Sequence, residues 1–215
     1  MMTIAEIRPG RQERECIVFF EDGTKLRVWK RTVAEQGLYS GRELSEEEMR
    51  ALHEAISADG AKERAARIIS ATNISQKQLR RRLVQKGESE ENAEKAVCWL
   101  KDLSLLDDLR TGETIVRSAL NKGYGERRIR QILREKGIPE EHWDELLSEL
   151  PPMDAAVDKL LRKKLKHIPP SREEAQSAAQ ALARCGHSWA DIKEGLERIS
   201  AEPDWEDESC LQESE

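Results

Sequence analysis

The residues with the clearest capacity for chemistry are the arginines and lysines in the middle of the chain. Between residues 110 and 138 there are eight bases and three acids. Arg127, Arg130 and Arg134 are spaced so that they would share one face of an α-helix, away from its apolar residues. Guanidinium groups bind phosphates and carboxylates at two points and stay charged at any physiological pH. The pattern therefore predicts a surface that binds an anionic partner.

A second basic helix is predicted earlier in the chain. Lys77 and Arg80 align with the first two arginines of that face, whereas a third, similar segment has Gln176 and Ala179 there. The candidate residues for binding a protein partner or DNA are Lys77, Arg80, Arg81, Lys86, Lys122, Arg127, Arg128, Arg130, Arg134 and Lys136. The alternative is a merely solvated surface, but the uneven distribution among similar segments favours contact with a partner.

No group of residues has the spacing of a catalytic or metal site. The four histidines and the four cysteines lie in unrelated contexts, without the short spacing of zinc ligands. The segment Gly123-Tyr124-Gly125 fits a connection between helices, not a phosphate-binding loop. Asp107 and Asp108 could form a metal pair, but a helix N-cap explains both carboxylates more simply. We expect a protein that is not an enzyme and has no catalytic residues, cofactor or bound metal.

The composition favours a cytoplasmic protein. Of its 215 residues, 36% are charged and 38% hydrophobic, a balance that suits several small cores better than one large core. Scattered cysteines fit reduced thiols, and the first residues do not have the pattern of a signal peptide. No apolar run is long enough to cross a bilayer. We therefore expect no membrane partner.

The net charge of −6 hides a separation of charge along the chain. Residues 201–215 carry seven acids and no base, so the rest of the chain has a net charge of +1. We expect this acidic tail, which contains Trp205, to be disordered. It would repel DNA unless it folded back onto the basic helices.

The elements that must position the basic residues are helices, preceded by one β-hairpin. Two β-rich runs, residues 16–20 and 24–29, flank an Asp-Gly pair that supplies the positive φ angles of a tight turn. A helix with a capping box is expected to begin after Ser45. Asp59 and Gly60 are expected to end that segment.

From about residue 60 onward the sequence repeats with a period near 50 residues. Gly87, Gly137 and Gly186, separated by 50 and 49 residues, each follow a helical pattern and are expected to cap it. The helix starts expected after these glycines are Ser89, Pro139 and Ser188. Each repeat should also have a preceding helix, at about residues 61–72, 109–122 and 153–167.

These patterns predict a mainly α protein with three tandem three-helix repeats in an elongated array and a small N-terminal β-hairpin and helix. The expected parts are the hairpin and helix region at residues 1–59, repeats at 60–106, 107–151 and 152–200, and the acidic tail at 201–215. Trp143 should lie in the core of the second repeat. Trp99 and Trp189 adjoin core positions and should be partly buried.

Several segments have sequences typical of one protein family. They are residues 75–87 (SQKQLRRRLVQKG), 105–108 (LLDD), 122–138 (KGYGERRIRQILREKGI) and 182–192 (LARCGHSWADI). With the N-terminal hairpin and the GLYSG segment that begins at Gly37, they resemble the RecX family, regulators of the RecA recombinase. The likeness covers residues 15–200. It departs from the family pattern at Thr111 and Gly112, where the family usually has an aromatic residue and an alanine.

The resemblance implies a regulator that binds RecA filaments on DNA and modulates the recombinase, which we expect it to inhibit, in recombination, DNA repair and the SOS response. The implied partners are the recombinase filament and single- or double-stranded DNA, the latter bound weakly by the chain itself. We expect a monomer. Two other functions stay open: a DNA-binding protein of tandem three-helix modules acting without a recombinase, and an interaction scaffold like other helical solenoids.

Overall fold

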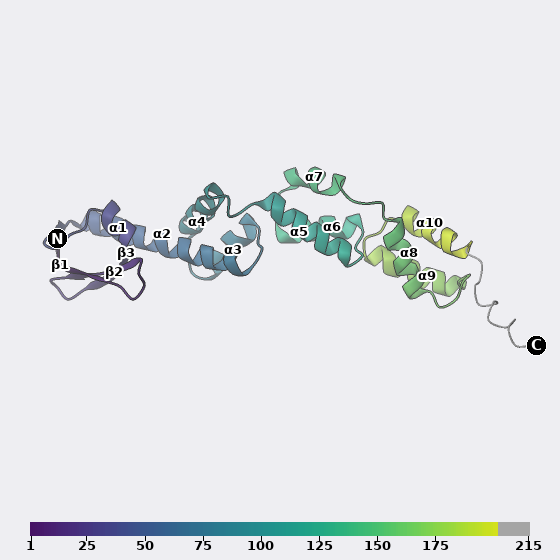
Figure 1. Cartoon of the computed structure of the whole chain (residues 1–215), viewed down its shortest axis with the longest axis horizontal. Coiled ribbons are helices and arrows are strands. Elements are labelled where there is room, and N and C mark those ends of the chain that lie inside the picture. Colours follow the sequence, from purple (N-terminus) through teal and green to yellow (C-terminus); the bar gives the residue numbers. More distant parts are fainter. Residues whose placement is uncertain (202–215) are drawn as a thin grey trace, which may run out of the picture. The chain divides into compact units, whose positions relative to one another are not determined.

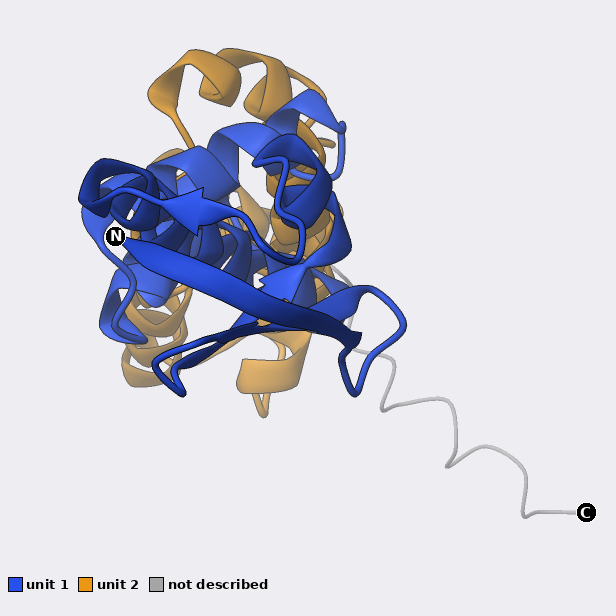
Figure 2. Ribbon diagram, turned by 90° about the vertical axis from the view of Figure 1, so that its left-hand side faces the viewer, with its two compact units in different colours: residues 1–106 blue, residues 107–215 orange. Residues whose placement is uncertain are grey.

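The structure, a computed structural model, describes residues 1–201 and consists of one small sheet followed by a succession of helices (Figure 1). The chain divides into two compact units, residues 1–106 and residues 107–215 (Figure 2). The mainly α fold with a small N-terminal β element confirms the prediction from the sequence. The acidic tail beyond Ala201, including Trp205, lies outside the described residues.

The N-terminal sheet has four antiparallel strands in the order β3-β2-β1-β4. They are β1 (Met2–Pro9), β2 (Glu15–Phe20), β3 (Lys25–Trp29) and β4 (Glu43–Leu44). The predicted β2–β3 hairpin is confirmed, and Gly23 in its turn has the expected positive φ of 87°. The sequence pattern does not reveal β1, because an irregularity in its pairing between Ile4 and Glu6 breaks the two-residue alternation of apolar positions, and the strand ends at Pro9. β4 has only two residues, too few for a periodic pattern.

Two helices follow the hairpin and pack against the sheet's apolar face. They are α1 (Lys30–Glu35) and α2 (Glu46–Ala71). The predicted capping box of α2 is confirmed, since the Glu48 N–H donates to the Ser45 hydroxyl at 3.2 Å and the Ser45 N–H donates to the Glu48 carboxylate at 2.8 Å. The sheet core consists of Ile4, Val18, Phe20, Val28, Leu38, Leu44 and Leu52.

The predicted end of this helix at Asp59 and Gly60 is wrong. α2 continues through both residues, so the expected boundary after residue 59 falls within a helix and the expected helix at 61–72 is its second half. The reason is tertiary. The buried Asp59 carboxylate accepts hydrogen bonds from Arg31 and Thr32 of α1, which hold the helix in place where the glycine would weaken it.

The second half of α2 forms the first repeat with two further helices in unit 1. They are α3 (Gln76–Gln85) and α4 (Glu90–Asp102). Their N-caps are Ser75 and the predicted Ser89, and Gly87 between the helices has the expected positive φ of 92°. The core of this repeat consists of Ala61, Ala65, Ile68, Ile74, Leu79, Leu83, Ala93, Ala96, Val97, Leu100 and Leu106.

The second repeat opens unit 2. Its elements are α5 (Asp108–Asn121), α6 (Glu126–Lys136), the 3-10 helix η1 (Glu140–His142) and α7 (Trp143–Ser148). Asp107 caps α5 as predicted. The expected helix start at Pro139 leads into the short η1, and a regular α-helix begins only at Trp143. Trp143 is buried in the core, as predicted, among Val116, Ala119, Ile129, Leu133, Ile138, Leu146 and Leu147.

The third repeat completes unit 2. Its helices are α8 (Asp154–Lys164), α9 (Arg172–Arg184) and α10 (Trp189–Ser200). α8 ends earlier than expected because Pro169 and Pro170 disfavour helical conformation in the residues that lead into them. The predicted partial burial of Trp189 is wrong: it is 58% exposed, because it is the first residue of α10 and the buried residues of that helix begin only at Ile192. The core consists of Val157, Leu161, Leu165, Ala178, Ala179, Leu182, Ile192 and Ile199.

Candidate functional site

The predicted basic face on α6 is present in the structure. Ile129 and Leu133 are fully buried, so they fix which side of the helix packs on the repeat. Arg127 and Arg134 are exposed, and Arg130 is half-buried beside them. The amphipathic spacing in the sequence therefore places three guanidinium groups on one side of one helix.

These three arginines differ in their contacts. Arg130 donates a hydrogen bond to the Glu126 carboxylate at 2.8 Å, one turn earlier on α6. Arg134 lies 3.8 Å from the Glu140 carboxylate and packs over the Trp143 ring, with 5.3 Å between the guanidinium carbon and the ring centroid. Among residues 1–201, Arg127 has no carboxylate partner. It is therefore the arginine of this face whose charge is least compensated.

Arg128, Lys122 and Lys136 lie near this face but are not part of it. Arg128 is half-buried, 3.7 Å from the Glu135 carboxylate, and its guanidinium lies 5.9 Å from the Tyr124 ring centroid. Lys122 is the C-cap residue of α5, and Lys136 is in the last turn of α6. A partner that contacts the three arginines would reach these two lysines only at its margins.

The basic face on α3 is smaller than the sequence suggests. Arg80 forms ion pairs with α4: its guanidinium lies 2.9 Å from the Glu90 carboxylate and 3.1 Å from the Glu94 carboxylate. Lys77 and Arg81, one turn apart, are exposed. Lys86 caps the end of the helix. Arg80 and Arg130, which align in the sequence, thus both form ion pairs with carboxylates of their own repeat.

Backbone hydrogen bonds tie the start of α6 to the third repeat within unit 2. The N–H of Gly125 donates to the Cys185 carbonyl at 2.9 Å, and the Arg127 N–H donates to the Gly186 carbonyl at 3.2 Å. A Cβ at Gly125 would lie 2.4 Å from the Gly186 oxygen, so a larger residue cannot be accommodated without movement. We call this arrangement the interrepeat contact. It sets the position of α6 relative to the third repeat.

His187 adds a side chain to the interrepeat contact. It is 2% exposed, and its Nε2 lies 2.9 Å from the Gly123 carbonyl, which requires the tautomer protonated at Nε2 if the imidazole is neutral. A histidine that the sequence did not single out is thus a packed, structural residue of unit 2.

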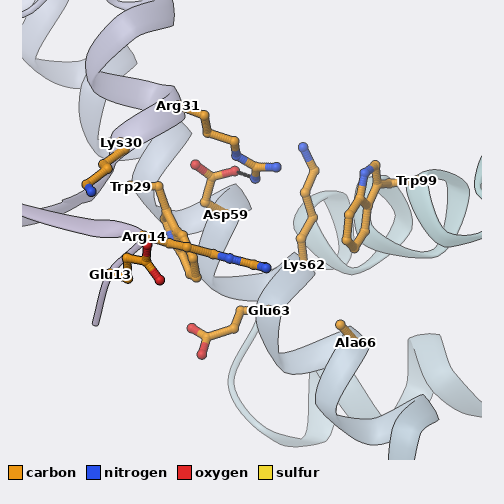
Figure 3. Close-up of a pocket in the computed structure, with 10 residues that line it drawn as sticks. All are labelled: Glu13, Arg14, Trp29, Lys30, Arg31, Asp59, Lys62, Glu63, Ala66 and Trp99. Atoms are coloured by element: carbon orange, nitrogen blue, oxygen red, sulfur yellow. Dashed lines mark hydrogen bonds and ion pairs between the residues drawn. The ribbon is translucent and has the colours of Figure 1, made fainter. Parts of the chain in front are cut away.

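A second group of bases, not found from the sequence, lies in unit 1. Arg14, Lys30, Arg31 and Lys62 line a cavity together with two tryptophans (Figure 3). The signal was present in the sequence, because Trp29 is followed directly by Lys30 and Arg31. The other two bases come from distant segments, and only the fold brings them there.

Two of the carboxylates whose pKa is lowered belong to helix capping boxes and are structural. The backbone N–H of Ser45 and the guanidinium of Arg42 lower the pKa of Glu48. The backbone N–H of Ser171, then His167, likewise lower the pKa of Glu174 in the capping box of α9. Within residues 1–201 no three His, Cys, Asp or Glu side chains are grouped so as to hold a metal ion. Over the same residues, no helix is both long and apolar enough to cross a membrane.

Comparison with known proteins gives matches to one family. Residues 107–147 match the family model described as RecX, second three-helix domain. The chain is 33% identical over 144 residues to a protein of Neisseria meningitidis serogroup C named regulatory protein RecX, covering 67% of this chain and 93% of that protein. A protein of the same name from Cronobacter sakazakii is 32% identical over 143 residues, covering 61% and 87% of the two chains.

Solved structures agree on the fold. The crystal structure of a regulatory protein RecX matches with a TM-score of 0.79 and 24% sequence identity, over 92% of this chain and all of the other. RecX from Lactobacillus salivarius matches with a TM-score of 0.61 and 20% identity, over 66% of this chain and 96% of the other. On the sequence matches, which span nearly all of the shorter relatives, this chain belongs to the RecX family of regulatory proteins and is not an enzyme.

Proposed function

We propose that this RecX-family protein binds a RecA recombinase filament assembled on DNA and inhibits it, in the cytoplasm, through the exposed basic faces of α3 and α6. The family membership supports a regulatory role, and the name of the family links it to recombination. The proposed contact residues are those of the two basic faces, led by Arg127 and Arg134 on α6 and by Lys77 and Arg81 on α3.

The observation that carries this proposal is that the two sides of α6 have different roles: one packs in the core and the other is exposed and basic. Ile129 and Leu133 supply the core contacts, while the arginines on the other side are not needed for packing. Arg127 lacks a carboxylate partner among residues 1–201, and the Arg134 side chain is 70% exposed. Exposed guanidinium groups form two-point bonds with phosphates or carboxylates, and because the guanidinium is planar, less entropy is lost per hydrogen bond formed.

The test is a triple charge reversal, Arg127→Glu, Arg130→Glu and Arg134→Glu. It changes the charge of one helix face by six units, which turns attraction to phosphate or to an acidic protein groove into repulsion. We expect the variant to lose inhibition of recombinase-driven strand exchange and of recombinase ATPase activity on single-stranded DNA. Inhibition equal to that of the parent protein would show that the face is only solvated.

The variant should stay folded. It removes the ion pair between Arg130 and Glu126, which stabilises a helix by about 0.3–0.5 kcal/mol. It also removes the stacking of Arg134 on Trp143, worth about 0.5–1 kcal/mol at an exposed site. Circular dichroism and thermal unfolding would show that the helix content is kept.

A matched control changes the same amount of charge elsewhere. Lys25, Arg50 and Lys101 are exposed residues of unit 1 outside both basic faces, and their reversal to glutamate also changes the net charge by six units. We expect this control to inhibit nearly as well as the parent. Reversal of Lys77 and Arg81 on α3 should produce a loss similar to, but smaller than, that of the α6 variant.

A second function is DNA binding without a recombinase. The observation that favours it is the basic second helix of two successive three-helix repeats, an arrangement also found in helix-turn-helix modules. The two functions differ in their dependence on the recombinase. If the parent protein binds duplex DNA tightly and inhibits only in proportion to the DNA that it covers, the DNA-only function replaces the first.

A further inference from the structure

Unit 1 contains a cavity of about 680 Å³ between the end of the sheet, α2 and α4 (Figure 3). Two tryptophans and four bases line it: Trp29, Trp99, Arg14, Lys30, Arg31 and Lys62. Figure 3 shows the two indole rings on opposite sides of the cavity, with Lys62 and the end of the Arg14 side chain between them. Neither basic face described above contributes to it.

The backbone fixes the sheet side of the cavity. The N–H of Lys30 donates to the carbonyl of Arg14 at 2.9 Å, which joins the loop between β1 and β2 to the start of α1. Trp29 is the last residue of β3, directly before that helix. This hydrogen bond fixes Arg14 next to Trp29 and Lys30, although Arg14 lies in a loop, Trp29 ends a strand and Lys30 begins a helix.

One of the four bases is already neutralised. The guanidinium of Arg31 donates to the carboxylate of Asp59, which is 6% exposed and also bound by the Thr32 hydroxyl. This pair holds α1 on α2 and contributes no net charge. Three bases then remain on the lining against two carboxylates, those of Glu13 and Glu63, a net charge of +1.

The two indoles offer stacking surface. Trp29 and Trp99 are half-buried, so part of each ring faces the cavity rather than the core. Trp99 packs against the core of the first repeat. The ammonium of Lys62 lies 6.0 Å from the centroid of the Trp99 ring, within reach of a negative group placed beside that ring.

We propose that this cavity binds one unpaired nucleotide of single-stranded DNA, with its base stacked on an indole and its phosphate held by Arg14, Lys30 and Lys62. Base–indole stacking together with a basic groove is the recurrent means of holding single strands without sequence preference. The proposal goes beyond the recombinase contact proposed above, because it requires no recombinase.

The lining and size of the cavity favour a nucleotide of a single strand over an acidic peptide or a DNA duplex. A net charge of +1 suits one phosphodiester, and the two indoles offer a stacking surface that a nucleobase uses and the carboxylate side chains of an acidic peptide do not. Bases in a duplex have both faces covered by their neighbours, so they cannot stack on an indole without being flipped out. The volume lies in the range of cavities that hold one small molecule, and a base with its sugar and phosphate is of that size.

The experiment measures binding of a fluorescently labelled oligothymidylate to the full chain by anisotropy, with no recombinase present. Trp29 is absent from the sheet core, so Trp29→Ala should leave the fold intact, as circular dichroism would show. We expect it to weaken binding about tenfold, the loss of one stacked base. Trp29→Phe, which keeps a ring, should retain most of the affinity. Equal affinity of all three proteins would overturn the proposal.

A charge reversal tests the phosphate contacts. Arg14→Glu combined with Lys62→Glu should weaken binding and lower the slope of log affinity against log salt by roughly 0.7, since the one phosphate held at the site is no longer neutralised and each phosphate of a single strand accounts for about 0.7. The matched control, Lys25→Glu combined with Arg50→Glu, changes the same charge outside the cavity. A control that weakens binding as much as the cavity variant would mean that only the overall charge matters.

Two further measurements distinguish binding in this cavity from binding on the basic faces of α3 and α6. Duplex DNA of the same length should bind Trp29→Ala and the parent protein equally, because no base is available for stacking. Ultraviolet cross-linking of the oligothymidylate should label the peptides that contain Trp29 or Trp99. Cross-links confined to α3 and α6 would overturn the cavity proposal while leaving the recombinase contact untouched. The triple variant of α6 should in turn keep the cross-links in unit 1.

Discussion

The backbone N–H of Arg127 donates a hydrogen bond to the carbonyl of Gly186, which lies 59 positions further along the chain and 3.2 Å away. The residue whose charge is least compensated on α6 is thus held by the third repeat as well as by its own. In the second repeat alone, the start of α6 would lack this anchor. The third repeat, which lacks the arginine face, serves the second by positioning it.

Replacing Gly186 by alanine should disrupt the interrepeat contact between the second and third repeats. The residue has a φ of +90°, and a Cβ there would lie 2.4 Å from the Arg128 backbone nitrogen. Gly87 provides the control, since it has a φ of +92° at the equivalent place in the first repeat and nothing within 4 Å of its Cβ position. We expect Gly87→Ala to cost about 1–2 kcal/mol for its backbone conformation alone. Gly186→Ala should cost roughly 1–3 kcal/mol more.

Denaturant unfolding of the two variants measures this difference. Equal losses of stability would mean that the interrepeat contact adjusts to a Cβ without cost, and α6 would then have no fixed position on the third repeat. A Gly186→Ala variant that is still folded should also inhibit the recombinase less well than Gly87→Ala.

Trp143 and Trp189 should respond very differently to truncation. Trp143 is buried, and its indole N–H donates to the Ile138 carbonyl at 3.1 Å. Trp143→Ala should destabilise unit 2 by about 3–5 kcal/mol, because it leaves a large cavity and an unpaired carbonyl. Trp189 is 58% exposed, so Trp189→Ala should change stability by no more than about 0.5 kcal/mol. Thermal unfolding would compare them, and a large effect of Trp189→Ala would show that its ring is packed.

Glu48→Gln should make stability less dependent on acid. The Ser45 N–H and Arg42 lower the pKa of Glu48 below its ordinary value of 4.5. A lowered pKa in the folded state means that the carboxylate stabilises the fold above pH 4.5 and that this contribution is lost as the pH falls through the folded-state pKa. The stability gap between parent and variant should thus be constant near neutral pH and shrink in acid.

Denaturant unfolding over a series of pH values would record that gap, with Glu35→Gln, on the exposed surface of α1, as the control. A gap that widens as the pH falls would contradict the assigned direction of the shift.

Deleting residues 201–215 should strengthen binding to bare DNA at low salt. The deletion removes seven acids and changes the net charge from −6 to +1, which lowers the repulsion of a polyanion. The gain should be smaller at high salt, where charges are screened. Binding by electrophoretic shift at two salt concentrations would test this. A truncated chain that binds DNA more weakly would indicate that the tail contributes contacts of its own.

Helix positions could be predicted from the sequence wherever a local rule decides them. The apolar spacing of Ile129 and Leu133, the glycine caps and the serine N-caps are all properties of a few neighbouring residues. The end of α2 could not be predicted from the sequence. Asp59 and Gly60 are typical of a helix end, and the helix continues through them because the fold places Arg31 against the Asp59 carboxylate. Trp189 was misjudged because proximity to an apolar stripe does not determine exposure.

The positions of the basic faces could be predicted from the sequence, but how far nearby carboxylates compensate their charge could not. Spacing alone places Arg80 and Arg130 on helix faces, yet neither helix periodicity nor composition shows that Glu90 and Glu94 compensate Arg80. The cavity of unit 1 could not be predicted from the sequence for a related reason. Its lining comes from a loop, a strand end and two helices, whose meeting depends on how the sheet packs against α2.

The uninterrupted course of α2 has a mechanical consequence. Its 26 residues form a rod about 39 Å long whose first half packs on the sheet and whose second half belongs to the first repeat. There is no joint at Asp59 where these halves could bend independently. A force exerted on the sheet by a bound DNA strand would be transmitted along α2 to α3 and α4. The sheet and the first repeat must therefore tilt together.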